Sequence, residues 1–218
     1  MTMMEEKTFK CPIDGEIFED GIIISTNQMG QHTDFKPVVG GVFPFPFYVH
    51  ACPKCGFSGY DEDFNEEYSD DFKEWVKSEL AAQLESGALY GGLKYLLAAQ
   101  CAEKTGREEK EIGDRYLRGA WCAQDEESEE LEARCRKESA SHFIKAIEAG
   151  EYEKNDRAAV TYLVGELYRR LGMPDEAAEW FGRVQGEVTD PGEQAWVLTM
   201  AEKQKTSPVE LFPEDLVQ

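Results

Sequence analysis

Residues 52–56 read Cys52-Pro53-Lys54-Cys55-Gly56, and this stretch decides how the N-terminal part of the chain folds. A Cys-Pro-x-Cys-Gly turn is tight enough for its two thiolates to converge on one tetrahedral ion, and the glycine lets the backbone curl back on itself. Two ligands do not complete a tetrahedral site. A second turn of this kind, or knuckle, is therefore expected elsewhere in the sequence.

The second knuckle is predicted at residues 11–15, Cys-Pro-Ile-Asp-Gly, where Asp14 stands at the position of the second thiolate. Two knuckles separated by a strand-rich insert are typical of a zinc ribbon. Aspartate oxygen is an acceptable though less common zinc ligand. We therefore predict a structural Zn²⁺ site with four ligands: Cys11, Asp14, Cys52 and Cys55.

The fourth ligand has alternatives. His50 lies two residues before Cys52, so both side chains would face the same side of an extended strand. His32 could reach the ion from the insert, and a water molecule could fill the position instead of Asp14. The remaining alternative is a ribbon that has lost its metal and keeps three unligated cysteines, since Cys-x-x-Cys pairs also occur in redox sites.

The composition changes near residue 65, and we place the first domain boundary there. Residues 1–65 hold five of the nine prolines and short β-branched and aromatic runs, which predict strands at 21–26 and 43–49. A segment of this size with few large aliphatic side chains usually needs a staple such as a metal ion. We predict a zinc-ribbon domain at 1–65, a helical domain at 66–204 and an extended tail at 205–218.

Beyond residue 65, apolar residues recur at i, i+3 and i+4, the spacing of one face of an α-helix. The pattern predicts helices at 72–84, 89–101, 112–121, 131–147, 156–171, 174–188 and 191–204. The predicted fold class is α+β and mainly α. A small β-rich ribbon precedes an antiparallel array of helical hairpins.

Residues 158–191 follow the pattern of a tetratricopeptide repeat. Small residues at its signature positions let paired helices approach, and aromatic residues fill the space between them. The signature positions carry Gly165, Tyr168, Gly172, Ala177 and Phe181. Residues 139–146 resemble the second helix of an earlier, degenerate repeat.

This order of motifs resembles a bacterial family of unknown function that combines an N-terminal CPxCG…CPxCG zinc ribbon with tetratricopeptide-like helices. The resemblance rests on the two knuckles, the Thr33-Asp34-Phe35 segment, Asp63-Phe64 and the helical repeats. It covers nearly the whole chain. The sequence departs from the family pattern at Asp14 and Lys36, where relatives often carry cysteine, and both departures concern the coordination sphere.

The resemblance supplies no established activity, and the leading hypothesis is a binding module without enzymatic activity. Repeats of this kind stack into a curved array whose first helices line a groove, here with Tyr162, Glu166, Arg169 and Arg170. Two arginines beside a tyrosine could clamp a carboxylate of a protein or peptide partner. The alternatives are an ordinary solvated helix face and self-association into a homo-oligomer. The array is expected to fold and bind without the metal.

The charge restricts the partners. The formal net charge is −21, and the segments before and after residue 65 are both acidic. Nucleic acids and anionic membranes are therefore not expected as ligands, because such binding rests on cationic contacts to phosphates. No apolar run is long enough to span a bilayer, and the first ten residues lack the apolar core of a signal peptide, so we expect a cytoplasmic protein.

The competing hypothesis is a zinc-dependent hydrolytic enzyme. Three cysteines would hold the ion, water would fill an open position, and Asp14 or His50 would act as the base. Against this, the sequence has no metalloprotease helix, phosphate-binding loop, nucleophile elbow or dinucleotide fingerprint. Cys101, Cys122 and Cys135 match no compact ligand spacing, and we expect them to be buried structural residues.

Overall fold

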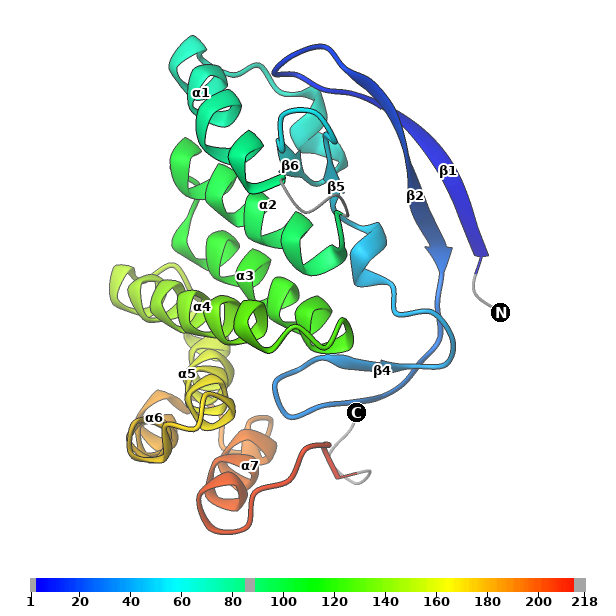
Figure 1. Cartoon of the computed structure of the whole chain (residues 1–218). Coiled ribbons are helices and arrows are strands. Elements are labelled where there is room, and N and C mark those ends of the chain that lie inside the picture. Colours follow the sequence, from blue (N-terminus) through cyan, green and yellow to red (C-terminus); the bar gives the residue numbers. More distant parts are fainter. Residues whose placement is uncertain (1–2, 85–88, 214–218) are drawn as a thin grey trace. The chain divides into compact units, whose positions relative to one another are not determined.

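The computed structural model describes residues 3–84 and 89–213 of the chain (Figure 1). Within these ranges the protein is mainly helical with small antiparallel sheets, which agrees with the predicted class. The strands are β1 (Met3–Lys10), β2 (Ile17–Ser25), β3 (Gln28–Gln31), β4 (Pro37–Val39), β5 (His50–Ala51) and β6 (Ser58–Gly59). The α-helices are α1 (Asp70–Trp75), α2 (Gly91–Thr105), α3 (Glu109–Asp125), α4 (Glu129–Ala149), α5 (Lys154–Arg170), α6 (Pro174–Glu187) and α7 (Ala195–Thr206). None of the helices in these ranges combines the length and apolar character needed to cross a bilayer.

The chain divides into two compact units that do not follow chain order. Unit 1 comprises Met1–Asn27, Gly40–Arg107 and Asp114–Cys135. Unit 2 comprises Gln28–Val39, Glu108–Gly113 and Arg136–Gln218. The predicted boundary at residue 65 lies inside unit 1, and residues 28–39 of the predicted ribbon belong to unit 2.

The core of unit 1 joins the ribbon to the helices that follow it. Phe9, Cys52 and Phe57 pack in one buried cluster with Leu80 and Leu97. Strand β6 packs on α2, and β1 pairs with β2 in a long antiparallel hairpin (Figure 1). Because burial of apolar surface contributes about 25 cal/mol per Å², the ribbon and these helices stabilise each other.

Two predicted elements of unit 1 differ from the structure. Residues 43–49 form no strand; they contain the short 3-10 helix η1 (Phe45–Phe47). Pro44 and Pro46 lack the N–H groups that a strand would donate to its neighbours. The helix predicted at 72–84 is divided into α1, a π-helical turn η3 (Val76–Leu80) and a 3-10 turn η4 (Ala81–Leu84).

The wide turn η3 lies where the knuckle packs against it. Gly56 has a φ of +78°, and a Cβ at this position would lie 3.0 Å from the carbonyl oxygen of Leu80. Only glycine therefore suits both the left-handed backbone and this close approach. Gly56, which the sequence predicts to let the chain curl back, therefore also permits the close contact with η3.

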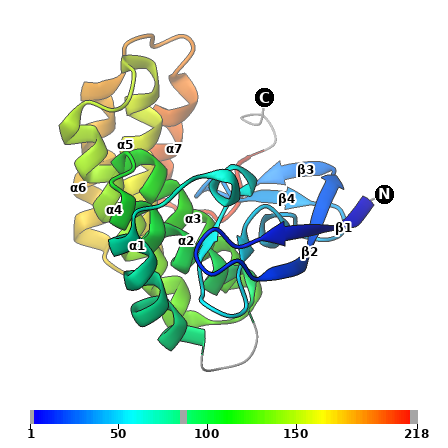
Figure 2. The same cartoon turned by 90° about the horizontal axis from the view of Figure 1, so that it is seen from above.

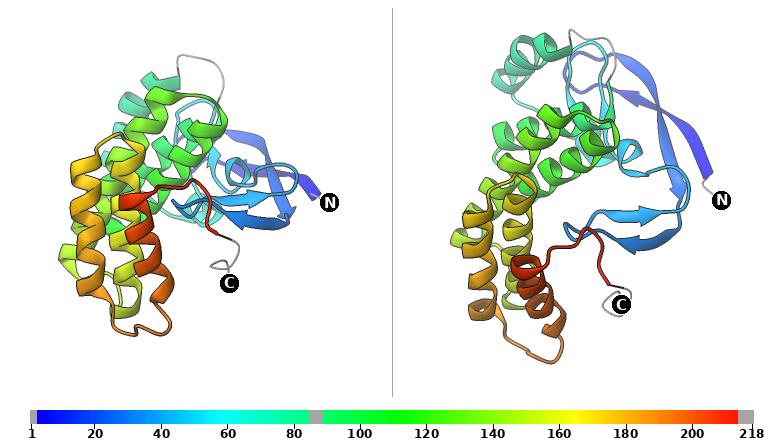
Figure 3. Two further views of the ribbon diagram at one scale, coloured as in Figure 1. Left: turned by 90° about the horizontal axis from the view of Figure 1, so that it is seen from below. Right: turned by 60° about the horizontal axis from the view of Figure 1, so that its bottom comes forward.

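Unit 2 contains three helices packed side by side, α5, α6 and α7 (Figure 3). A Cβ at Gly165 of α5 would lie 2.7 Å from the Phe181 ring of α6, so the two helices are in very close contact. Strands β3 and β4 form an antiparallel hairpin (Figure 2). After α7 the chain runs beside this hairpin, where Leu211 forms a bridge with His32.

Candidate metal centre

The two knuckles have the same backbone hydrogen bonds although their sequences differ. In the first, the N–H of Gly15 donates to the carbonyl of Cys11, and the N–H of Cys11 donates to Glu16, at 3.0 and 2.8 Å. In the second, the N–H of Gly56 donates to Cys52, and that of Cys52 to Phe57, again at 3.0 and 2.8 Å. Asp14 therefore occupies the position in its turn that Cys55 occupies in the other turn.

The tertiary structure brings the four predicted ligands together. One ligand atom from each of Cys11, Asp14, Cys52 and Cys55 lies within 4.8 Å of all the others. The Sγ atoms of Cys11 and Cys55 are 3.5 Å apart, and Sγ of Cys52 is 3.9 Å from Oδ1 of Asp14. The ligand–ligand edge around a tetrahedral zinc ion is about 3.5–3.8 Å for these bond lengths. The set can therefore hold a metal ion.

The candidate centre is shielded from solvent. The three cysteines are 0–3% exposed, and the Asp14 side chain is 11% exposed. Hydrogen bonds from the Cys11 and Cys55 thiols lower the pKa of Cys52 to about 2, whereas the hydrogen bond to Cys52 raises the pKa of Cys11 to about 12. A divalent cation would displace the thiol protons, because coordinated thiols are deprotonated.

The two histidine alternatives lie elsewhere. His50 is outside the group of four, and its Nδ1 and Nε2 lie 3.1 Å from Asp20 and 3.2 Å from Asp61. Its ring stacks on Phe9 at 4.1 Å between centroids. His32 belongs to unit 2, where it pairs with the segment after α7. The alternation argument for His50 fails because β5 ends at Ala51, before the knuckle turn begins.

His50 instead lies at the edge of a second site in unit 1, an open pocket of about 350 Å³. The Asp20 carboxylate accepts hydrogen bonds from both His50 and Lys94, the latter at 2.6 Å. Burial alone would raise the pKa of Asp20, but these hydrogen bonds and charges outweigh it and hold the pKa below its usual value. Besides His50, the pocket is lined by Ile22, Ile23, Phe47, Tyr48, Tyr60, Asp61, Glu62 and Arg118.

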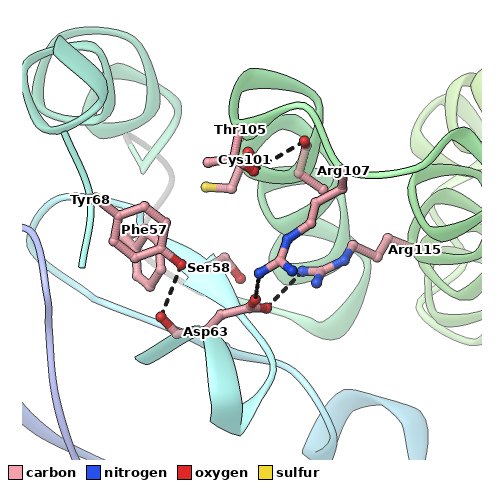
Figure 4. A pocket seen from close by; sticks show the side chains of 9 residues that line it. Phe57, Ser58, Asp63, Tyr68, Cys101, Thr105, Arg107 and Arg115 are labelled. Atoms are coloured by element: carbon pink, nitrogen blue, oxygen red, sulfur yellow. Dashed lines mark hydrogen bonds and ion pairs between the residues drawn. The ribbon is translucent and has the colours of Figure 1, made fainter. Parts of the chain in front are cut away.

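A third feature of unit 1 is a small cavity beside Asp63 (Figure 4). The buried Asp63 carboxylate lies 2.9 Å from Arg115 and 3.2 Å from Arg107, and Tyr68 donates a hydrogen bond to its backbone carbonyl. Glu66 also pairs with Arg107, so two carboxylates face the two arginines, and the accessible space is only about 10 Å³, about the size of one water molecule. This arrangement ties η2 (Asp61–Asn65) to α3 and to the segment between α2 and α3.

The residues predicted to line a partner groove lie in unit 2 and are buried or partly buried. Tyr162 and Glu166 are fully buried. Arg169 and Arg170 both pair with Glu166 at 2.8 Å. Arg170 also lies 3.5 Å from the buried carboxylate of Asp34. These two arginines therefore pair with carboxylates of the chain itself, and the expected clamp on a partner's carboxylate stays a prediction.

A family model described as an uncharacterised protein conserved in bacteria, DUF2225, matches residues 4–207. The chain belongs to the DUF2225 family. No curated protein and no solved structure matches it. The match spans both knuckles and the helices, so the DUF2225 assignment agrees with the resemblance to an uncharacterised bacterial family and supplies no activity.

Sequence reasoning missed several charged residues that this DUF2225 chain buries. Arg136 is 1% exposed and pairs with Asp34 at 2.8 Å. A signal for it was present, because Arg136, Ser139, Ala140 and Phe143 follow the helical spacing of a buried face. A charged residue within such a stripe indicates a buried ion pair. Asp20, Asp63 and Lys94 carried no comparable signal.

Proposed function

We propose that this DUF2225 protein is a non-enzymatic protein-interaction module whose ribbon is stabilised by a structural zinc ion. The observation that carries the proposal is the convergence of two matching knuckles on one buried group of three thiols and one carboxylate. Thiolate-rich tetrahedral sets suit zinc better than magnesium or calcium, which prefer oxygen ligands. Cys11, Asp14, Cys52 and Cys55 would hold the ion, and it would supply folding energy rather than chemistry.

A closed site supports a structural role. Four protein ligands complete a tetrahedral zinc sphere, whereas catalytic zinc keeps one position for water. The four ligand side chains are nearly or fully buried, so the group of ligands offers little access to a substrate. His50, the base in the hydrolytic hypothesis, has both ring nitrogens beside carboxylates instead.

The interaction role is supported by the helices of unit 2. The close contact of Gly165 with Phe181 has a counterpart in α3 and α4, where a Cβ at Gly113 would lie 2.6 Å from the Phe143 ring. We interpret these pairs as two tetratricopeptide-like repeats, since a small residue facing an aromatic ring is the contact that the repeat pattern requires. The acidity of the chain favours protein partners over nucleic acids.

The test combines metal analysis with an activity assay. The full-length protein should contain one zinc ion per chain by elemental mass spectrometry, and Cys52→Ser and Cys55→Ser should lose it. Cys122→Ser is the matched control, because Cys122 is also fully buried but outside the ligand group. Zinc-dependent hydrolysis of generic ester, amide or phosphate substrates by the wild-type protein would contradict the proposal and favour the open-site enzyme.

A further inference from the structure

The tip of the β3–β4 hairpin is held by unit 2 in the manner of a bound peptide. Burial is concentrated at the tip: Thr33 and Asp34 are fully buried, whereas Met29 in β3 is 76% exposed. The hairpin, Gln28–Val39, is inserted between two stretches of unit 1 yet belongs to unit 2. A few anchoring side chains therefore account for its attachment.

The first anchor is a carboxylate. Oδ2 of Asp34 lies 2.8 Å from Nη1 of Arg136 in α4 and 3.5 Å from Nε of Arg170 in α5. The hydroxyl of Thr33 donates to Glu166 at 2.6 Å, and Glu166 in turn holds Arg170. Charge-assisted contacts of this kind recognise a carboxylate with strength and geometric specificity.

The second anchor is an aromatic ring. Phe35 lies 5.8 Å from Tyr162, 6.1 Å from Trp196 and 5.9 Å from Phe212 between ring centroids, and it stacks on Phe212. Its φ is +69°, a left-handed conformation that is uncommon for a residue with a side chain. The surrounding rings hold the backbone in this conformation, because such strain persists only where the environment imposes it.

The third anchor is strand addition by the segment after α7. The N–H of Thr33 donates to the carbonyl of Glu210 at 3.1 Å, and the N–H of Phe212 donates to Gln31 at 2.9 Å. His32 and Leu211 form the antiparallel bridge between these hydrogen bonds. Main-chain pairing with side-chain pockets is a recurrent mode of peptide recognition.

The charges of the groove favour an acidic ligand. Three arginines gather around the carboxylates of Asp34 and Glu166: Arg136, Arg169 and Arg170. These positive charges lie in a chain whose formal net charge is −21. An acidic segment is therefore attracted to this groove although the chain as a whole repels it.

We propose that the groove formed by α4, α5, α7 and Val209–Phe212 is a docking site for a partner-protein segment with an acidic residue followed by an aromatic one. The hairpin tip occupies this groove as an intramolecular competitor. The proposal rests on the interaction role argued above and names its ligand chemistry. The partner segment replaces the Asp34 carboxylate between the arginines and the Phe35 ring among the aromatic side chains.

The test uses the full chain with residues 28–39 replaced by a glycine-serine linker of equal length. The probe is a fluorescent synthetic peptide of residues 30–37, Gly-Gln-His-Thr-Asp-Phe-Lys-Pro. We expect saturable binding to the linker variant and at least tenfold weaker binding to the wild-type chain, whose groove is filled. Asp34→Asn in the peptide, or Arg170→Ala in the linker variant, should weaken binding at least tenfold, and Arg183→Ala on α6 should not.

A second variant keeps the test decisive if the linker variant does not fold. Asp34→Asn combined with Phe35→Ala in the full chain weakens the internal competitor and retains the hairpin, so it should bind the peptide more tightly than the wild type does. Absence of peptide binding by every variant that is folded by circular dichroism would overturn the proposal. So would equal binding of the Asp34→Asn peptide. Zinc content, measured on the same samples, reports separately on the metal site.

Discussion

At Asp14 a carboxylate occupies the position that a thiolate occupies in the matching turn. Its Oδ1 accepts a hydrogen bond from the N–H of Glu16 at 3.1 Å, which orients the side chain within the knuckle. Oxygen is a harder donor than sulfur, so a site with one carboxylate retains zinc less firmly than four thiolates would. The identity of the residue at position 14 thus sets how readily the ribbon loses its metal.

Substitution of Asp14 tests its role as a ligand. We expect Asp14→Ala to weaken zinc retention by at least about 10–100-fold, since losing even an outer-shell partner has effects of that size. Asp14→Cys should bind zinc more tightly. Competition with a chromophoric chelator measures both. His50→Ala is the control and should keep its zinc; if it sheds zinc while Asp14→Ala does not, Asp14 is not the ligand.

Asp34 gives a pH-dependent prediction at the same scale. Burial alone would raise its pKa, but the charges of Arg170 and Arg136 outweigh burial and hold the pKa below its ordinary value. A lowered folded-state pKa stabilises the fold at every pH above the unfolded value of about 3.9, and this contribution is lost as pH falls through the folded pKa. His32, Glu166 and Glu210 are further titratable groups beside the hairpin tip.

The Asp34→Asn variant separates this contribution from general acid unfolding. We expect it to be about 3–5 kcal/mol less stable than the wild type at pH 7, because it takes from the buried Arg136 the carboxylate that pairs with it at 2.8 Å. The difference should shrink below about pH 4, as the wild-type carboxylate takes up a proton. Urea unfolding between pH 3 and pH 7 measures it. Asp175→Asn at the exposed start of α6 should change little; a pH-independent difference at Asp34 would contradict the charge argument.

At the scale of elements, the pairing of α5 with α6 depends on a glycine. The Gly165 backbone approaches the Phe181 ring so closely that a methyl group would lie 2.7 Å from Cδ1. Gly182 in α6 has no atom within 4 Å of its Cβ position and is exposed. The two glycines therefore share a helical setting and differ in packing.

This pair provides a matched test. We expect Gly165→Ala to destabilise the protein by about 1–3 kcal/mol, because overpacking forces the ring or the helix to move. Gly182→Ala should stabilise it by about 0.5–1 kcal/mol through the higher helix propensity of alanine. Thermal unfolding monitored by circular dichroism measures both. Equal effects of the two substitutions would show that the helices do not pack closely at Gly165.

At the scale of the whole molecule, the ribbon and the helices that follow it share the core of unit 1. The metal is therefore expected to support these helices as well as the ribbon. Helical periodicity predicts that residues 66–204 fold alone and need no metal. In the structure, Leu80 and Leu97 pack against the ribbon residues Cys52, Cys55 and Phe57. Loss of the ribbon would therefore expose the apolar faces of η3 and α2 to water.

We expect residues 66–204, expressed alone, to lack stable structure in α1 and α2. Chelation of zinc from the full-length protein should likewise increase hydrogen exchange in α1 and α2 by at least tenfold, with little effect on α5 and α6, whose core lies in unit 2. Hydrogen exchange followed by mass spectrometry resolves these segments. Unchanged protection of α1 and α2 after chelation would show that the metal supports the ribbon alone.

The sequence by itself determined the features that rest on local pattern. The knuckle at Cys52 and its relative at Cys11 follow from residue spacing, as does the position of Asp14, and most helices follow from apolar periodicity. The prediction of a strand at 43–49 was wrong because it gave the β-branched and aromatic residues more weight than Pro44 and Pro46. The missing N–H groups of these two prolines are also a local feature of the sequence, so the sequence alone contained the argument against a strand.

Only the tertiary structure decided which segments share a core and what fills the groove. Asp34 is about one hundred residues from Arg136, its salt-bridge partner, and still further from Arg170 and Glu166. No local pattern encodes that separation, because periodicity reports which face of an element is buried and not what buries it. Thus the sequence shows two neighbouring arginines, Arg169 and Arg170, whereas the placement of the hairpin's Asp34 carboxylate beside Arg170 required three-dimensional packing.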